Sequence, residues 1–309
     1  MRRTIWLVLS LFITLSTWGK VKLPSIIGDN MVLQRSSCVN IWGWADPSQK
    51  VTVEPSWNHQ VYATQASGYG KWLLQIQTPE AGGPYHIQIS DGEILVLNDI
   101  LIGEVWICSG QSNMEMPVHG FYGQPVAGSL DEIFEAKQYS GIRMFTVPPT
   151  PAKYPQENCG GSWLQSTPES VRDFSAVGYF FGKNLSRILN IPIGLITPNC
   201  GGIAIEPWMT VEAIKETVGI NQELAFTPQV KTEAANASYL FNGMIAPICN
   251  YTSRGFIWYQ GESNQHNYFD YDKLMTSMVK LWRKEWKNEG MPFYYVQLVP
   301  FPYDGAEKI

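Results

Sequence analysis

The chain has 309 residues, of which 45% are hydrophobic and 13% aromatic, and its formal net charge at pH 7 is -5. This length and apolar content suffice for a buried core and for more than one domain, which excludes a disordered chain. The 22 lysines and arginines are scattered among 27 acidic residues, so the sequence lacks the basic surface that nucleic-acid binding requires.

The first 19 residues combine a basic start, an apolar stretch at residues 5–15 and small residues at Thr17 and Gly19. This pattern predicts a cleaved secretory signal peptide, because a membrane span needs roughly 20 apolar residues. A buried helix and an uncleaved anchor are the alternatives. We therefore expect a secreted or periplasmic protein without a membrane span after signal cleavage.

Five cysteines are spread over the chain, which is an odd number with wide spacings. They form neither a metal-binding pattern nor a disulfide framework, even though export would permit disulfides. Cys108 lies inside an apolar run and is expected to be a buried free thiol. The cysteines therefore predict no bound metal.

Residues 20–99 form short alternating runs rich in Val, Ile, Tyr and Trp, separated by clusters of Gly, Pro, Asn and Asp. Such runs are typical of an antiparallel β-sandwich, and we assign these residues to a first domain with a structural role. The tryptophans Trp42, Trp44 and Trp72 could stack on sugar rings, but packing in the core explains them more simply.

From residue 100 the pattern changes to longer apolar runs that alternate with helical periodicity. Residues 100–110 (ILIGEVWICSG) form one apolar run, residues 174–190 repeat apolar side chains at helical spacing, and a second such helix follows at residues 268–286. Further short apolar runs begin at residues 191, 254 and 291. Strands that alternate with helices predict a parallel sheet wrapped in helices over residues 100–309.

Polar or glycine-rich loops follow three of these predicted strands. They are SGQSNM at residues 109–114, NCGG at residues 199–202 and QGESN at residues 260–264. Ligands of parallel sheets bind beyond the carboxyl ends of the strands, so we expect the three loops to meet at one rim.

These loops contain the groups that acyl transfer needs. Ser112 could act as the nucleophile, its own N–H and that of Gly201 or Gly202 could bind an oxyanion, and the Gln260 amide could be a third donor. Taken singly, each feature fits a turn or a helix cap equally well. The chemistry is indicated only by the combination.

Six segments together resemble one family. They are LPSIIGDNMVLQR, VNIWGWADP, AGGPYHIQI, LIGEVWICSGQSNMEMPV, GGIAIEPWM and WYQGESN. The sequence is similar to the sialate O-acetylesterase family of carbohydrate esterases, within the SGNH hydrolases. The resemblance implies a three-layer, flavodoxin-like α/β domain after the β-sandwich. It also implies serine-dependent hydrolysis of O-acetyl esters on sugars, such as sialic acid or a plant polysaccharide like xylan, without a cofactor.

The resemblance also implies roles for individual residues. Ser112 is then the nucleophile, and Gly202 or Gly201 is the oxyanion donor of the second motif. Gln260 takes the place at which other SGNH enzymes use asparagine, and Asn264 competes for that role.

Two further positions bear on the motif loops. Glu262 is typical of the family, and we expect it to orient its loop without a chemical step. Ile203 stands where a hydroxyl residue often follows the glycine pair, so hydrogen bonding at that point should differ from the family.

The general base is missing from this pattern. The family uses an Asp-x-x-His pair near its C-terminus, but none of the four histidines follows an aspartate at that spacing. We therefore expect that the last part of the hydrolase domain is not in this chain, and that this fragment is weakly active or inactive. His119 and His266 are the alternative bases.

Two other functions compete with the esterase. One is a non-catalytic, glycan-binding pseudo-esterase that holds O-acetylated carbohydrate at the same rim. The other is a serine hydrolase of a different ester, such as a lipase or arylesterase, which would need a large apolar cleft.

Overall fold

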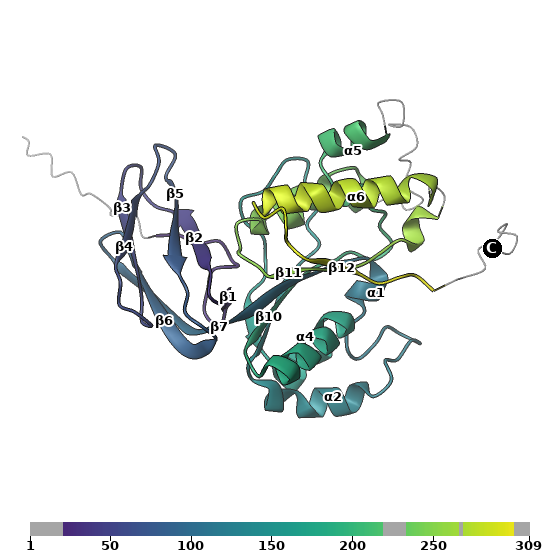
Figure 1. The fold of residues 1–309 in the computed structure, drawn as a ribbon, viewed down its shortest axis with the longest axis horizontal. Coiled ribbons are helices and arrows are strands. Elements are labelled where there is room, and N and C mark those ends of the chain that lie inside the picture. Colours follow the sequence, from purple (N-terminus) through teal and green to yellow (C-terminus); the bar gives the residue numbers. More distant parts are fainter. Residues whose placement is uncertain (1–20, 219–232, 266–267, 300–309) are drawn as a thin grey trace, which may run out of the picture.

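The computed structural model describes residues 21–218, 233–265 and 268–299 and shows a mixed α/β fold around a large central sheet (Figure 1). This confirms the predicted α/β class. The expected signal peptide at residues 1–19 lies outside the described residues, as does His266. In the described segments, no helix is both long and apolar enough to cross a membrane.

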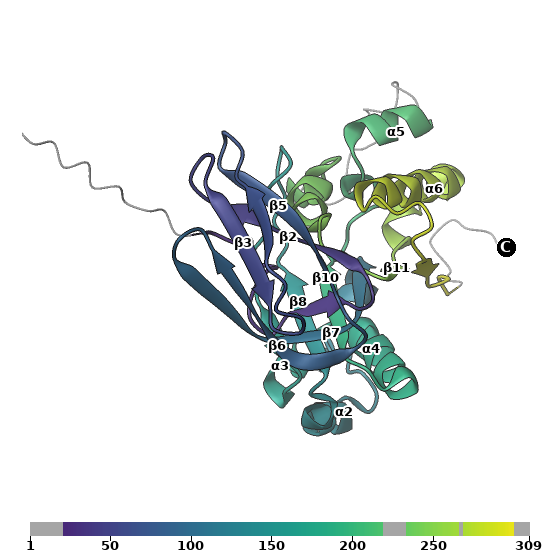
Figure 2. The ribbon, with the colours of Figure 1, turned by 60° about the vertical axis from the view of Figure 1, so that its left-hand side comes forward.

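The first part of the chain is entirely of β structure. Its strands are β1 (Val32–Gln34), β2 (Cys38–Trp44), β3 (Lys50–Pro55), β4 (Tyr62–Gln65), β5 (Lys71–Gln77), β6 (Gly82–Ser90) and the first half of β7 (Ile94–Gly110). β2 pairs antiparallel with β5, while β3 lies between β4 and β6, and β6 pairs antiparallel with β7 (Figure 2). Both groups of strands send alternate side chains into one core.

The tryptophans of this part pack inside it. Trp42 and Trp72 are buried, and the partly exposed Trp44 donates its indole N–H to Glu157. The aromatic faces of Trp42 and Trp72 are therefore used for packing, as the simpler of the two sequence interpretations expects.

The second part alternates strands and helices. Its strands are β8 (Ile142–Val147), β9 (Trp163–Gln165), β10 (Ile193–Pro198), β11 (Gly255–Tyr259) and β12 (Phe293–Tyr295). Its helices are α1 (Ser112–Glu115), α2 (Ser129–Glu135), α3 (Pro168–Arg172), α4 (Ala176–Leu189), α5 (Val211–Val218) and α6 (Tyr268–Glu285). Short 3-10 turns lie at Ala136–Tyr139, Glu206–Trp208, Glu233–Ala235, Ala246–Ile248 and Glu262–Asn264, with a π turn at Phe241–Ile245.

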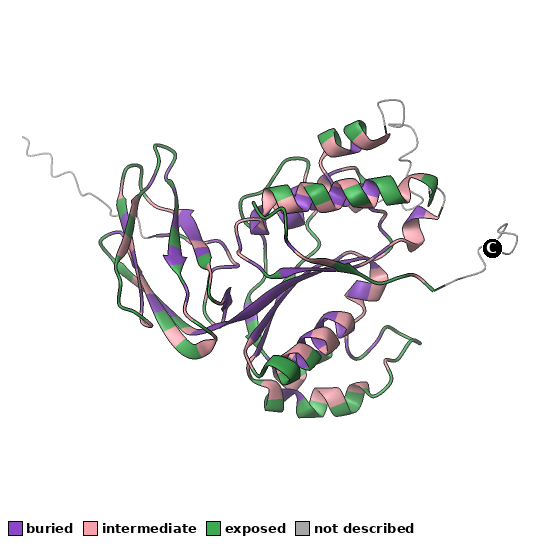
Figure 3. Ribbon diagram, in the orientation of Figure 1, coloured by how far each residue is buried: buried purple, intermediate pink, exposed green. Residues whose placement is uncertain are grey.

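The central sheet has the strand order β9-β8-β10-β7-β11-β12, and all of these strands except β9 run parallel. Helices α2 and α4 cover one face, and α5 and α6 cover the other (Figure 1). Along β7, Val105 and Ile107 belong to the core on the α6 side, while Trp106 and Cys108 belong to the core on the α4 side. The second half of β7, residues 100–110, is therefore buried on both faces (Figure 3).

β7 is a single strand of 17 residues that serves both parts of the chain. The boundary expected at residues 99 and 100 falls inside it. Asp99 has a positive φ of 56° and accepts a hydrogen bond of 2.9 Å from Arg143 of β8. The half of the strand after this point pairs with β10 and β11.

All five cysteines lie in the described residues and are free. Cys108 is fully buried as expected, and burial raises the pKa of its thiol far above the usual value. Burial also raises the pKa of Cys200 to about 11. In the described segments, no group of three or more His, Cys, Asp or Glu side chains is placed to hold a metal ion.

Candidate active site

The three motif loops begin side by side at the carboxyl edge of the sheet. Gly110, the last residue of β7, pairs with Tyr259 at the end of β11 and forms a parallel bridge to Asn199, which follows β10. Because β10 and β11 flank β7, the loops that follow all three strands leave the sheet at the same level. The convergence expected from the sequence is present.

Ser112 begins helix α1 immediately after this edge. It is partly exposed, whereas the neighbouring Gln111 is buried and accepts hydrogen bonds from the N–H groups of Gly261 (3.3 Å) and Ser263 (3.2 Å). Through these two hydrogen bonds, Gln111 attaches the turn that contains Ser112 to the third loop. Among the described residues, neither the hydroxyl nor the N–H of Ser112 has a hydrogen-bond partner.

The second loop packs directly against the Ser112 turn. A Cβ atom at Gly201 would lie 3.5 Å from the Cβ of Ser112 and 2.6 Å from Oε2 of Glu115, so a larger residue there would displace the Glu115 carboxylate. Gly202 has a φ of 71°, and a Cβ atom at this position would meet no atom within 4 Å. Gly202 thus needs glycine for its backbone conformation and faces open space.

The amide of Gln260 is buried and already paired. Its Nε2 donates to the carbonyl of Ile203 (3.2 Å) and to Oδ1 of Asn264 (2.8 Å), and its Oε1 accepts from the hydroxyl of Tyr271 (2.9 Å). Gln260 exposes only 3% of its surface. One N–H of the amide therefore joins the third loop to the second, and the other bonds within the third loop. The oxyanion role expected for Gln260 stays a prediction that requires this amide to turn.

Asn264, the competitor for that role, belongs to the same buried network. Its Oδ1 accepts the N–H of Ile205 (2.9 Å), its Nδ2 donates to Oε2 of Glu206 (3.1 Å), and it exposes 1% of its surface. Asn264 thus connects the third loop to the segment that follows the second loop. The oxyanion role of Asn264 likewise stays a prediction.

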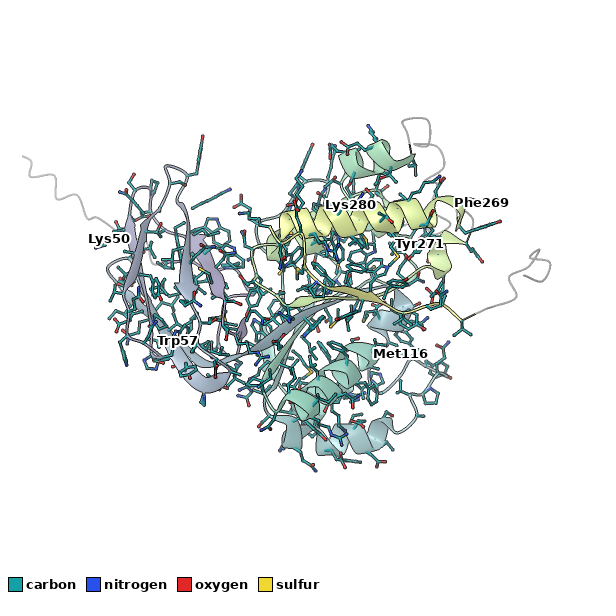
Figure 4. All side chains as sticks on the ribbon, in the orientation of Figure 1. Lys50, Trp57, Met116, Phe269, Tyr271 and Lys280 are labelled. Carbon is teal, nitrogen blue, oxygen red and sulfur yellow. The ribbon has the colours of Figure 1, made fainter. Side chains whose placement is uncertain are left out.

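Tyr271 closes this network from the first turn of α6 (Figure 4). Its hydroxyl donates to Gln260, and burial raises its pKa to about 12.

We expect Tyr271→Phe to lower the free energy of unfolding by about 1 to 3 kcal/mol, because Oε1 of Gln260 then loses its donor inside the protein. Urea unfolding followed by circular dichroism measures this. Tyr69→Phe is the matched control, since Tyr69 is 92% exposed, and an equal loss in both variants would contradict the network.

Glu262 connects the third loop to the Ser112 turn. Its Oε1 accepts a hydrogen bond of 2.6 Å from Nδ2 of Asn113, and its Oε2 is buried without a partner among the described residues. This contact fits the expected task of orienting the loop, which stays a prediction.

Three residues that the sequence did not single out also contribute to this rim, namely Gln111, Asn113 and Glu115. All three lie in the first motif, each within three positions of Ser112. The helical spacing of Glu115, three positions after Ser112, was the available signal, because residues three apart share one face of a helix.

No described histidine hydrogen-bonds to Ser112. His119 is exposed, and its Nδ1 lies 2.9 Å from the carbonyl of Arg172 and 3.4 Å from Asp173. His59 and His86 belong to the first, all-β part of the chain. The alternative base His119 is thus engaged elsewhere, while His266 lies outside the described residues.

Comparisons with known proteins give one consistent family. The family model for a carbohydrate esterase, sialic acid-specific acetylesterase, matches residues 102–308. The sialate O-acetylesterases of Pongo abelii and Homo sapiens are 30% and 29% identical, over 94% of this chain and 61% of each relative. A solved carbohydrate acetylesterase from Xanthomonas citri is 31% identical with a TM-score of 0.80, and the match covers 90% of this chain and 60% of that one. The chain spans about three fifths of the length of these relatives, and it belongs to the sialic acid-specific acetylesterase family of carbohydrate esterases.

Proposed function

We propose that this protein is a serine-dependent O-acetylesterase acting on carbohydrates. The observation that carries the proposal is the position of Ser112 on the turn at which the three motif loops meet, with a hydroxyl that has no partner among the described residues. The family membership supports hydrolysis of O-acetyl esters as the reaction class.

In the proposed mechanism, Oγ of Ser112 attacks the acetyl carbonyl carbon while a base takes its proton. The oxyanion that forms accepts hydrogen bonds from the N–H groups of Ser112 and Gly202. The sugar oxygen leaves with a proton as a free hydroxyl, and the acetyl group stays on Ser112 as an ester. Water then attacks this ester, acetate is released and Ser112 regains its proton.

We propose that the base is a histidine outside the described residues. No described histidine contacts Ser112, and the family resemblance implies an Asp-x-x-His pair. We also propose the finer architecture that the resemblance implies, a three-layer SGNH domain behind a β-sandwich. Secretion or a periplasmic location is proposed from residues 1–19.

The substrate class is an O-acetylated sugar, and acetylated sialic acid is the first candidate because the matched relatives are named sialate O-acetylesterases. Acetylated xylan is the second. Among the described residues, no histidine is hydrogen-bonded to the hydroxyl of Ser112. This also favours one other function, a pseudo-esterase that binds the acetylated glycan without turnover.

The test uses the protein encoded by the complete reading frame that contains this sequence. Acetate release is measured from O-acetylated sialic acid, from acetyl-xylan and from a long-chain aryl ester. We expect release from at least one acetylated sugar and little hydrolysis of the long-chain ester. Binding of an acetylated sugar without acetate release identifies the pseudo-esterase, and a preference for the long-chain ester contradicts the carbohydrate assignment.

A further inference from the structure

The second motif loop contains two candidate oxyanion donors, and the structure treats them differently. The N–H of Gly201 donates a hydrogen bond of 2.6 Å to Oε2 of Glu115, the last residue of helix α1. The N–H of Gly202 has no acceptor among the described residues. One of the two donors is thus occupied by the protein itself.

Two consecutive N–H groups of the second motif loop are held by hydrogen bonds to the first motif. The N–H of Cys200 donates to the carbonyl of Gly110 (3.1 Å), and the next N–H, that of Gly201, donates to Glu115. Gly202 is therefore the next residue along the loop with an N–H free for a ligand. The Glu115 charge also adds to burial in raising the pKa of the Cys200 thiol, which places the carboxylate close to this segment.

Glu115 lies one helical turn after Ser112, so the same short helix carries the nucleophile and the acceptor. A Cβ atom added at Gly201 would lie 3.5 Å from the Cβ of Ser112, so the second loop passes close to the nucleophile. A shift of Ser112 would move Glu115, and with it the loop that presents Gly202. The geometry thus couples the nucleophile and the second loop through one side chain.

We propose that Glu115 is a positioning residue that occupies the Gly201 N–H and thereby presents the Gly202 N–H to the acetyl oxygen. This inference rests on the proposed esterase function. Glu115 acts as a hydrogen-bond acceptor, without touching the substrate. A neutral acceptor of the same shape should therefore replace it, whereas a methyl group should not.

The kinetic test compares Glu115→Ala and Glu115→Gln in the protein from the complete reading frame. Glu115→Ala is expected to lower kcat for acetate release about 10- to 100-fold with KM unchanged within about twofold, because small displacements of catalytic groups cost rates of this order. Glu115→Gln should keep kcat within about fivefold of the wild type, since its amide oxygen still accepts from Gly201. Asp131→Ala, which removes an exposed carboxylate from α2, is the control.

A second measurement reads the contact without any activity. The chain has two Cys-Gly pairs, Cys159-Gly160 and Cys200-Gly201, so labelling Cys carbonyl carbons and Gly nitrogens isolates two amide resonances. In the wild type the Gly201 amide proton should resonate downfield, because it donates to a carboxylate. In Glu115→Ala this proton should lose the downfield shift and exchange with solvent at least about tenfold faster. Gly160 should not respond and serves as the internal control.

The outcomes separate this inference from the proposed function. If the wild type releases no acetate, the esterase proposal fails, while the Gly201 resonance still reports on the contact. If Glu115→Ala keeps or raises kcat, Glu115 either blocks an oxyanion donor at Gly201 or only stabilises the loop, and the inference is overturned. It is overturned as well if Gly201 does not respond, or if Glu115→Gln loses as much activity as Glu115→Ala.

Discussion

Replacing Ser112 by alanine is expected to reduce acetate release by about 10⁴-fold or more. Removal of a serine nucleophile costs roughly this much in serine hydrolases, because the oxyanion donors that remain stabilise only the attack of water. The Ser112 side chain is partly exposed and has no hydrogen-bond partner among the described residues, so the variant should fold like the wild type. The measurement is kcat for O-acetylated sugar, together with mass spectrometry for an acetylated protein, which only the wild type should form.

Ser109→Ala is the control for this result because it changes a serine of the same motif. The hydroxyl of Ser109 is fully buried and donates to the carbonyl of Pro198 (2.5 Å), so it cannot reach a substrate. We expect Ser109→Ala to lose about 1 kcal/mol of stability and most of its activity to remain. The assignment is wrong if Ser112→Ala keeps a tenth or more of the wild-type rate.

Gly110→Ala is expected to lower the free energy of unfolding by about 3 kcal/mol or more, the sum of overpacking and backbone strain. Gly110 has a φ of 150°, and a Cβ atom there would lie 2.0 Å from the carbonyl oxygen of Tyr259. The methyl group must push β7 and β11 apart directly before Ser112. Acetate release should therefore also fall about 100-fold, since the catalytic loops are displaced.

The matched control is Gly68→Ala, because a Cβ atom at Gly68 would meet no atom within 4 Å. Its free energy of unfolding should stay within about 0.5 kcal/mol of the wild type, as for most surface substitutions. Chemical unfolding of both variants measures the difference. Equal stability of Gly110→Ala and Gly68→Ala would show that the close approach of β7 and β11 at this level is wrong.

Periodicity carried most of the fold prediction. Apolar side chains at helical spacing located α4 and α6 to within two residues of the ends that the structure gives them. Unbroken apolar runs located β7, β10 and β11, because strands covered on both faces have no polar side to alternate. The meeting of their loops then followed from the geometry of parallel sheets.

The directions of the amide side chains in the site could not be predicted in this way. Sequence motifs mark Gln260 and Asn264 as polar residues of a catalytic loop, and the resemblance gives one of them an oxyanion role. The structure pairs them with Tyr271 and Glu206, which belong to separate segments of the chain. Such long-range pairs follow from packing, which no local pattern encodes.

The continuation of β7 through residue 99 could not be predicted for the same reason. Asn98 and Asp99 are turn-forming residues and indicate the end of a strand. In the structure β7 continues through them, and Asp99 adopts a positive φ while Arg143 of a distant strand pairs with its carboxylate. A tertiary contact thus overrides the local preference.

The continuity of β7 has a consequence for how the molecule can be divided. One strand supplies an antiparallel partner to β6 with its first half, and it carries Ser112 beyond the end of its second half. Independent domains are usually joined by an exposed linker, and a hinge needs such a linker. Here every residue from 94 to 110 is strand, so the two parts cannot swing against each other at this crossing. A catalytic fragment that began at residue 100 would keep the pairing of its central strand with β10 and β11, but it would lose β1 and β6, the partners that residues 100–103 of β7 have in the all-β part.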